Sequence, residues 1–186
     1  MINLRMAGIM QTQENQTKYP LSMKLYHWVA ALMVGALIYV GYNMSDMPAS
    51  DEKWRMYFMH KSFGLLFLIV MLSRLYNRFR SKIPPLPEKI SIFDAKMSHI
   101  VHYLLYGVLI IMPISGIFMS IFAGKGMPFF FTTFFSDIAK HEEINGAAWI
   151  VHTKLPTIIL LLIGLHLVGS MKHFIVDKVN LLKRMI

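Results

Sequence analysis

The sequence predicts an all-α integral membrane protein, an antiparallel bundle of four transmembrane helices with both termini in the cytoplasm. Three observations lead to this prediction. Of the 186 residues, 55% are hydrophobic and only 16% are charged, a balance that a water-soluble domain of this length does not carry. Four apolar segments are long enough to cross a bilayer, and basic residues gather on one side of them.

The four spans are expected at about residues 25–45, 54–76, 97–122 and 148–171. Residues 1–22 are polar and lack an apolar core, so we expect a disordered tail there and neither a signal peptide nor a span. Residues 23–186 then form one membrane domain.

Short connections make consecutive helices antiparallel neighbours, as in a simple bundle. The first connection is residues 46–53, and the second contains the prolines of residues 84–87. The third, residues 124–145, is longer and carries the aromatic stretch 127–135. We expect this stretch to be an outer loop that dips into the lipid headgroup layer.

Basic residues predict the orientation. In this arrangement thirteen of the nineteen Lys and Arg residues fall on one side: Arg5, Lys18, Lys24, Arg74, Arg78, Arg80, Lys82, Lys89, Lys96, Lys172, Lys178, Lys183 and Arg184. Because basic residues remain in the cytoplasm, both termini and the connection after the second span are expected there. This rule and attraction to anionic membrane lipid account for the net charge of +9, and no nucleic-acid signature is present.

The chain contains no cysteine, which excludes disulfides, thiolate-ligated iron–sulfur clusters and zinc sites built on thiolates. Any metal centre must therefore use His, Met or carboxylate ligands.

Two histidines in the last span, His152 and His166, are fourteen residues apart. Fourteen residues are almost four helical turns, so both imidazoles leave one face of the helix, roughly 21 Å apart along its axis. An ionisable residue inside a membrane helix costs free energy and indicates a functional site. Two on one face predict two stacked sites, one near each membrane surface.

Other histidines lie at matching depths. His60, near the outer end of the second span, matches His152, and His27, near the inner start of the first span, matches His166. A lone membrane histidine is more often a packing or interfacial residue, but two depth-matched pairs favour ligands. Facing imidazoles without cysteine suit a haem with two histidine ligands. At the inner site the spacing leaves His27 and His102 as competing partners of His166.

Small residues on the spans would let a flat macrocycle approach the backbone, although ordinary helix packing explains each of them equally well. They are Gly35, Gly41, Gly64, Gly107, Gly116, Gly164 and Gly169.

Local motifs then resemble the bacterial cytochrome b561 family from about Lys18 to the end of the chain. They are Tyr26-His27-Trp28, His60-Lys61-Ser62-Phe63-Gly64, His99 and His102 before Leu104-Leu105-Tyr106, Pro113-Ile114-Ser115-Gly116, Leu165-His166, and Lys172-His173-Phe174 with Asp177. Each motif is weak, but their order and spacing across four helices make a strong signal. Phe174 departs from the family pattern, which often has a second histidine there.

The resemblance implies a multi-pass cytochrome of the bacterial inner membrane that binds two b-type haems and exchanges electrons with membrane quinone. It implies haem ligands at His27, His60, His152 and His166, and so favours His27 at the inner site. His102, His173, Lys61 and Arg74 become candidates for contacts with a haem propionate or a quinone.

Superoxide is the expected small donor, since some members of the family resemble superoxide:quinone oxidoreductases. A cationic rim near the outer pair would steer this anion. The rim consists of Lys53, Arg55, Lys61, Lys125 and Lys154. Propionate and headgroup contacts explain the same rim more simply.

Two alternative functions stay open at this point. The chain could be the cytochrome b subunit that anchors a dehydrogenase or hydrogenase, or a transport protein for a non-haem metal. A homodimer is a further candidate assembly.

Overall fold

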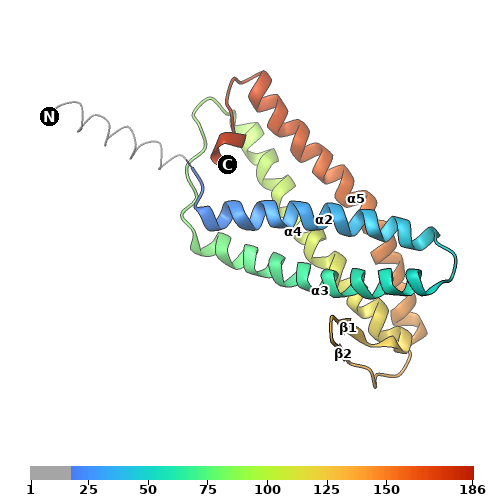
Figure 1. The fold of residues 1–186 in the computed structure, drawn as a ribbon. Coiled ribbons are helices and arrows are strands. Elements are labelled where there is room, and N and C mark those ends of the chain that lie inside the picture. Colours follow the sequence, from blue (N-terminus) through green and yellow to red (C-terminus); the bar gives the residue numbers. More distant parts are fainter. Residues whose placement is uncertain (1–17) are drawn as a thin grey trace.

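A computed structural model describes residues 18–186, and four long helices dominate it (Figure 1). They are α2 (Leu21–Asp46), α3 (Asp51–Arg80), α4 (Ile92–Ser120) and α5 (Glu142–Ile175). A π-helical turn, η1 (Ile121–Lys125), extends α4, and a 3-10 turn, η2 (Leu182–Arg184), follows α5. The tail expected to be disordered covers residues 1–22; residues 1–17 lie outside the described residues, and α2 begins within the expected tail at Leu21.

The predicted all-α class with four membrane-spanning helices is confirmed, because each of the four helices is long and apolar enough to cross a membrane. Every helix begins before the span expected from hydropathy, since polar caps lie outside the apolar segments, and the third span is completed by η1 beyond the end of α4. Ser50 begins α3 by accepting a hydrogen bond from the amide of Lys53 at 3.2 Å, and Ser91 begins α4 by accepting one from Asp94 at 3.1 Å. Such side-chain oxygens satisfy amides that lack a partner in the first helical turn.

Consecutive helices run antiparallel, with α3 packed against α2 and α4, and α4 packed against α5 (Figure 1). The bundle therefore has two ends. We call the end where the helices reach Leu21, Arg80, Ile92 and Ile175 the basic end. The opposite end, at Asp46, Asp51, Ser120 and Glu142, is the hairpin end.

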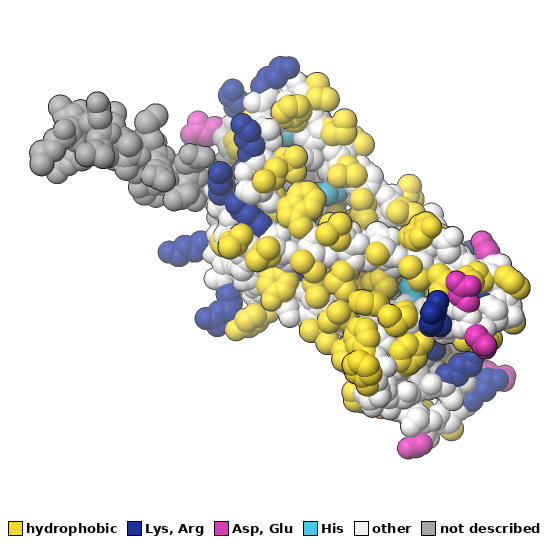
Figure 2. Space-filling view, in the orientation of Figure 1, with side chains coloured by type: hydrophobic (Ala, Val, Ile, Leu, Met, Phe, Trp, Pro, Cys, Tyr) yellow, Lys and Arg dark blue, Asp and Glu magenta, His cyan; other side chains and the backbone are white. Residues whose placement is uncertain are grey.

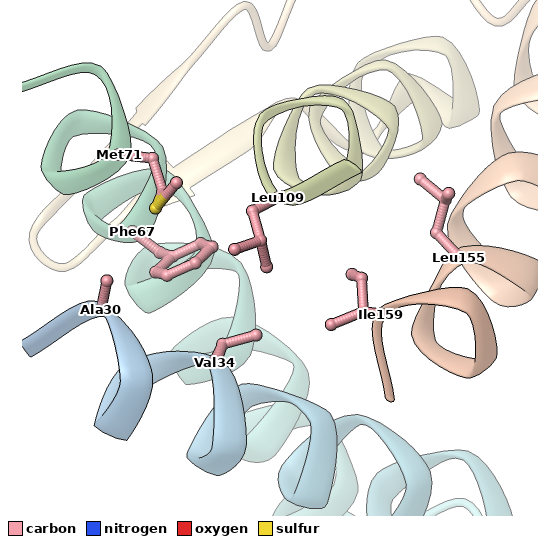
Figure 3. Close-up of a cluster of buried hydrophobic side chains, with 7 residues drawn as sticks. All are labelled: Ala30, Val34, Phe67, Met71, Leu109, Leu155 and Ile159. Carbon is pink, nitrogen blue, oxygen red and sulfur yellow. The ribbon is translucent and has the colours of Figure 1, made fainter. Parts of the chain in front are cut away.

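A cluster of buried apolar side chains lies across the middle of the bundle, and all four helices contribute to it (Figure 3). Its members are Ala30, Val34, Phe67, Met71, Leu109, Leu155 and Ile159. Most other large apolar side chains are exposed, and Figure 2 shows them covering the length of the bundle between charged ends. This pattern suits contact with lipid, since burial inside the protein does not account for so much apolar surface.

The aromatic stretch expected to be a loop forms an antiparallel hairpin of β1 (Met127–Phe129) and β2 (Thr132–Phe134). The hairpin is attached to α3, because the amide of Phe130 donates to the hydroxyl of the fully buried Ser62 at 3.0 Å. The rings of Phe63 and Phe130 also meet edge to face, with centroids 5.3 Å apart. Phe131, at the turn, is fully exposed.

Candidate functional site

Two pairs of histidines face one another across the bundle, one pair towards each end. At the hairpin end, His60 of α3 and His152 of α5 have ring centroids 6.2 Å apart and planes at 89°. At the basic end, His27 of α2 and His166 of α5 have centroids 6.3 Å apart and planes at 59°. The structure thus brings together both pairs that depth along the helices predicted.

His102 of α4 also contacts His166, with ring centroids 5.1 Å apart and planes at 81°. Its Nδ1 lies 2.6 Å from the main-chain oxygen of Ser98, one turn earlier in the same helix. His99, by contrast, is exposed and stacks on Tyr103. Three imidazoles therefore meet at the basic end, and His99 lies apart from them.

The Nδ1 atoms of the paired histidines differ in their surroundings. Nδ1 of His152 lies 3.0 Å from the main-chain oxygen of Met112 and 3.2 Å from the hydroxyl of Ser115. Arg74 donates to Nδ1 of His27 at 3.0 Å. An Nδ1–H of His152 can donate to the carbonyl of Met112, so Nε2 is the nitrogen that this ring presents to a ligand or metal. Nδ1 of His60 is buried and has no hydrogen-bond partner among the described residues.

Two glycines make room for the hairpin-end pair. A Cβ atom at Gly116 would stand 2.7 Å from Cε1 of His152, and one at Gly41 would stand 3.3 Å from Cε1 of His60. These two glycines therefore accommodate the imidazoles themselves. A Cβ at any other glycine of the predicted set would meet nothing within 4 Å; these are Gly35, Gly64, Gly107, Gly164 and Gly169.

Each pair opens into a cavity. The hairpin-end cavity has a volume of about 280 Å³ and is lined by His60, His152, Lys61 and mainly apolar side chains. The basic-end cavity is larger, about 410 Å³, and is lined by His27, His102 and His166. The buried cluster of Figure 3 lies between the two pairs, since its α5 members Leu155 and Ile159 fall between His152 and His166 in the helix.

The other predicted contact residues lie beside these cavities. Lys61 donates to the hydroxyl of Ser120 at 2.8 Å and lines the hairpin-end cavity. Arg74 and His173 line the basic-end cavity, where Arg74 also stacks over the ring of Tyr106 at 5.1 Å. The five residues of the predicted cationic rim do not all face the hairpin-end cavity. Lys61 is the one member that lines this cavity, and Lys125 packs over the Trp54 ring.

At the mouth of the basic-end cavity, His173 lies 2.6 Å from a carboxylate oxygen of Asp177. Lys172 donates to Asp177 at 3.1 Å and to Asp94 at 2.6 Å, so that one ammonium group bridges two carboxylates. Hydrogen bonds from His173 and Lys172 hold the pKa of the Asp177 carboxyl below its usual value.

The geometry of both pairs fits a metal held between two imidazoles. An imidazole nitrogen lies about 2 Å from a metal that it ligates and about 1.1 Å from the ring centre, which puts two opposed rings roughly 6 Å apart between centres. The distances of 6.2 and 6.3 Å agree with this value. His102 and His166, at 5.1 Å, are closer together than two rings on opposite sides of one metal would be. Apolar cavities beside the pairs suit a flat apolar macrocycle around that metal.

Sequence reasoning missed several residues of the site. The carbonyl of Met112 and the hydroxyl of Ser115 come from α4, and spacing within one helix carries no signal for a partner on another. The residues after α5 also line the basic-end cavity, among them Leu181, Arg184 and Met185. They are few and mixed in character, so hydropathy alone gave no reason to connect them with a site.

The chain has clear relatives. The family model described as prokaryotic cytochrome b561 matches residues 18–186. A protein of Yersinia pestis named "Probable superoxide oxidase CybB" is 27% identical over 168 residues, which cover 86% of this chain and 90% of the relative. Two proteins of Escherichia coli (strain K12) are also similar. Cytochrome b561 homolog 1 is 24% identical over 86% of this chain, and cytochrome b561 homolog 2 is 27% identical over 91% of it, with 91% of each relative covered.

Proposed function

This chain belongs to the prokaryotic cytochrome b561 family, and on that premise we propose that its two histidine pairs each hold one b-type haem. Membership makes it a multi-pass membrane cytochrome b that takes part in electron transfer, and the four apolar helices agree with this. Two haems per chain, their ligands and the partners of electron transfer are our proposal.

We assign His60 and His152 to the haem at the hairpin end, and His27 and His166 to the haem at the basic end. The observation that carries the assignment is the separation of the ring centroids, 6.2 Å in one pair and 6.3 Å in the other. The shorter distance of 5.1 Å between His102 and His166 favours His27 as the ligand. His102 then lies beside the ligand pair, where it can contact a propionate or a quinone.

When bound, a haem with two histidine ligands accepts and releases one electron. The side chains of this protein bind it, orient the imidazoles and exclude water. Met112 and Ser115 fix the ring of His152, and contact with the backbone of Gly116 sets its position. The buried cluster between the pairs keeps the interior of the bundle apolar and excludes water from it.

Lys61 and Arg74 line the two cavities and are the basic residues best placed to contact propionates. The guanidinium of Arg74 carries five N–H donors, so it can bind a carboxylate while it contacts His27. His173 lies at the mouth of the basic-end cavity and is a candidate for quinone contact.

We propose that the basic end faces the cytoplasm across the bacterial inner membrane. Twelve of the described Lys and Arg residues lie towards this end and six towards the other, as the positive-inside rule requires of a cytoplasmic surface. Figure 2 shows Lys and Arg side chains gathered at the basic end. Electrons would enter at the hairpin end and leave at the basic end to membrane quinone.

Superoxide is the donor that we favour, because one relative carries the name superoxide oxidase and Lys61 lines the hairpin-end cavity. The alternative function is that of a cytochrome b subunit anchoring a dehydrogenase or hydrogenase. The short connections between helices leave little surface for such a partner outside the membrane. Transport of a non-haem metal finds no support at the hairpin end, since none of the described residues that line this cavity is a carboxylate.

Purified protein reduced with dithionite should give the absorption bands of b-type haem, and a pyridine haemochrome assay should give two haems per chain. A result of one haem per chain, or none, would refute the proposal of two haem sites. Electron transfer is tested separately by following haem reduction with superoxide and haem reoxidation with a quinone analogue.

A further inference from the structure

The residues that follow α5 turn back across the basic end of the bundle. We call residues 176–186 the return segment. The reversal is made at Lys178, whose φ of 55° is a left-handed conformation that few residues other than glycine adopt. The amide of Val179 then donates to the main-chain oxygen of His173 at 2.9 Å. The return segment is therefore held against the end of α5.

The return segment is also bonded to the start of α2, more than 150 residues away in the sequence. Three successive main-chain oxygens accept hydrogen bonds: Arg184 from the amide of Tyr19 at 3.1 Å, Met185 from Nε1 of Trp28 at 2.9 Å, and Ile186 from Nζ of Lys24 at 2.6 Å. Because the acceptors are main-chain oxygens, the return segment is bound here through its backbone.

Arg184 fixes the segment to a third element. Its guanidinium donates to the main-chain oxygen of Pro85, in the connection between α3 and α4, at 2.7 Å and lies 5.6 Å from the ring centroid of Tyr19. Only 8% of Arg184 is exposed, whereas the neighbouring Lys183 points to solvent. A buried arginine with such contacts indicates a structural clamp, since a surface cation would not be desolvated without partners.

This clamped segment forms part of the wall of the basic-end cavity. It contributes Leu181, Leu182, Arg184 and Met185 to the cavity that contains His27, His102 and His166. The other residues that line this partly open cavity come from α2, α3, α4 and α5, together with Tyr19 and Leu86. The return segment is thus the part of the wall that crosses the end of the bundle.

We propose that the return segment is a floor that shields the basic-end histidines from water and water-soluble oxidants, and that Arg184 is the positioning residue that locks it. An electron held at the basic-end pair would otherwise be lost to soluble oxidants. With the floor in place, a lipid-soluble acceptor can approach between the helices while a charged one cannot. The shielding of an electron rests on the proposed function, whereas the shielding from water does not.

The absence of cysteine from the chain allows a direct test. Ser170→Cys places one thiol on α5 in the wall of the basic-end cavity. The purified full chain in nanodiscs is treated with a sulfonated maleimide, which is soluble only in water. Lys89→Cys, in the exposed connection between α3 and α4, reports the rate for an open site. We expect the thiol at position 170 to react at least tenfold more slowly than the one at position 89.

Adding Arg184→Ala to Ser170→Cys should raise the labelling rate at least tenfold, and truncation after Asn180 should have the same effect. Lys183→Ala, which removes an exposed neighbour, is the matched control and should leave the rate unchanged. If the truncated chain does not fold, Lys24→Met, which removes only the contact with Ile186, should give an intermediate rate. Fast labelling of Ser170→Cys in the otherwise native chain, or no effect of Arg184→Ala, would overturn the proposal.

A second measurement concerns the electron. Reduced haem is mixed with ferricyanide, which takes one electron from it in water, or with a lipid-soluble quinone. Arg184→Ala should speed oxidation by ferricyanide at least tenfold and change oxidation by quinone less than twofold. Equal changes in both rates would contradict the proposed floor. A chain that binds no haem but shows the labelling pattern would refute the proposed function and leave the floor intact.

Discussion

The imidazole of His152 lies directly against the backbone of Gly116 on the facing helix. A Cβ atom at position 116 would stand 2.7 Å from Cε1 of the ring and 3.0 Å from Nδ1. Contacts this short require the ring to move, because neither the helix backbone nor a Cβ atom can bend away. Nδ1 of His152 meanwhile lies 3.0 Å from the carbonyl oxygen of Met112, so the glycine and the carbonyl position one ring together.

Gly116→Ala should therefore displace His152 and reduce haem content at the hairpin end by at least half. The measurement is a pyridine haemochrome assay with the reduced absorption spectrum. Gly107→Ala, in the same helix, is the matched control, because a Cβ there meets nothing within 4 Å. Equal haem content in the two variants would show that the contact with Gly116 does not position the ligand.

His152→Ala should empty the hairpin-end site and leave the basic-end haem, and His166→Ala should do the reverse. Each change removes one of the two histidines that we assign to that haem. Haem content should fall from two per chain to one in each variant, with different absorption bands remaining. Loss of both haems in both variants would mean that haem binding at one site depends on folding at the other.

His27→Ala and His102→Ala distinguish the two partners of His166. We expect His27→Ala to lose the basic-end haem and His102→Ala to retain it, since the separation of 6.3 Å, and not that of 5.1 Å, matches two rings on opposite sides of one metal. Haem stoichiometry and the reduced spectrum measure the outcome. A haem that survives in His27→Ala and is lost in His102→Ala would make helix α4 the source of the ligand.

Neutralising the basic residues of the hairpin end should slow haem reduction by superoxide. The variant replaces Lys53, Arg55, Lys61 and Lys125 together, and stopped-flow absorbance measures the rate. The effect should shrink as ionic strength passes about 0.15 M, where the Debye length is ~8 Å. Reduction by a neutral quinol should hardly change.

The control for this experiment neutralises four basic residues at the opposite end, Arg80, Lys82, Lys89 and Lys96. It should leave the reaction with superoxide unchanged. Equal slowing with superoxide and with quinol would mean that the rim acts on the haem potential, as expected if its lysines bind propionates. No slowing with superoxide would favour a rim that contacts only haem and lipid.

Asp177 makes the stability of the folded protein depend on pH in the acidic range. Its pKa in the folded protein is held below the unfolded value of about 3.9 by hydrogen bonds from His173 and Lys172. A lowered pKa means that the stabilisation is fully present above the unfolded pKa and is lost as pH falls through the folded pKa. Asp177→Asn should therefore lower Tm at pH 7, and the difference from the native chain should close below pH 4. A difference in Tm between Asp177→Asn and the native chain that stays constant down to pH 3 would contradict this prediction.

The local sequence was sufficient for the helices and the depth of the histidines. Apolar length predicts each span, and the 3.6-residue period places His152 and His166 on one face, because both are properties of a single helix. The family resemblance, confirmed by a match over residues 18–186, came from the same local motifs. Helix ends were less accurate, because the caps at Ser50 and Ser91 lie in polar sequence outside the apolar segments.

Only the tertiary structure decided which residues of different helices and loops contact one another. His27 of α2 and His102 of α4 both contact His166, and the ring separations of 6.3 and 5.1 Å are set by how these helices and side chains pack against α5. The hairpin of residues 127–134 takes its place from Ser62, and the return segment is held by Lys24 and Trp28 at the far end of the chain. These contacts join residues that periodicity cannot relate, so they exist only once the four helices have packed.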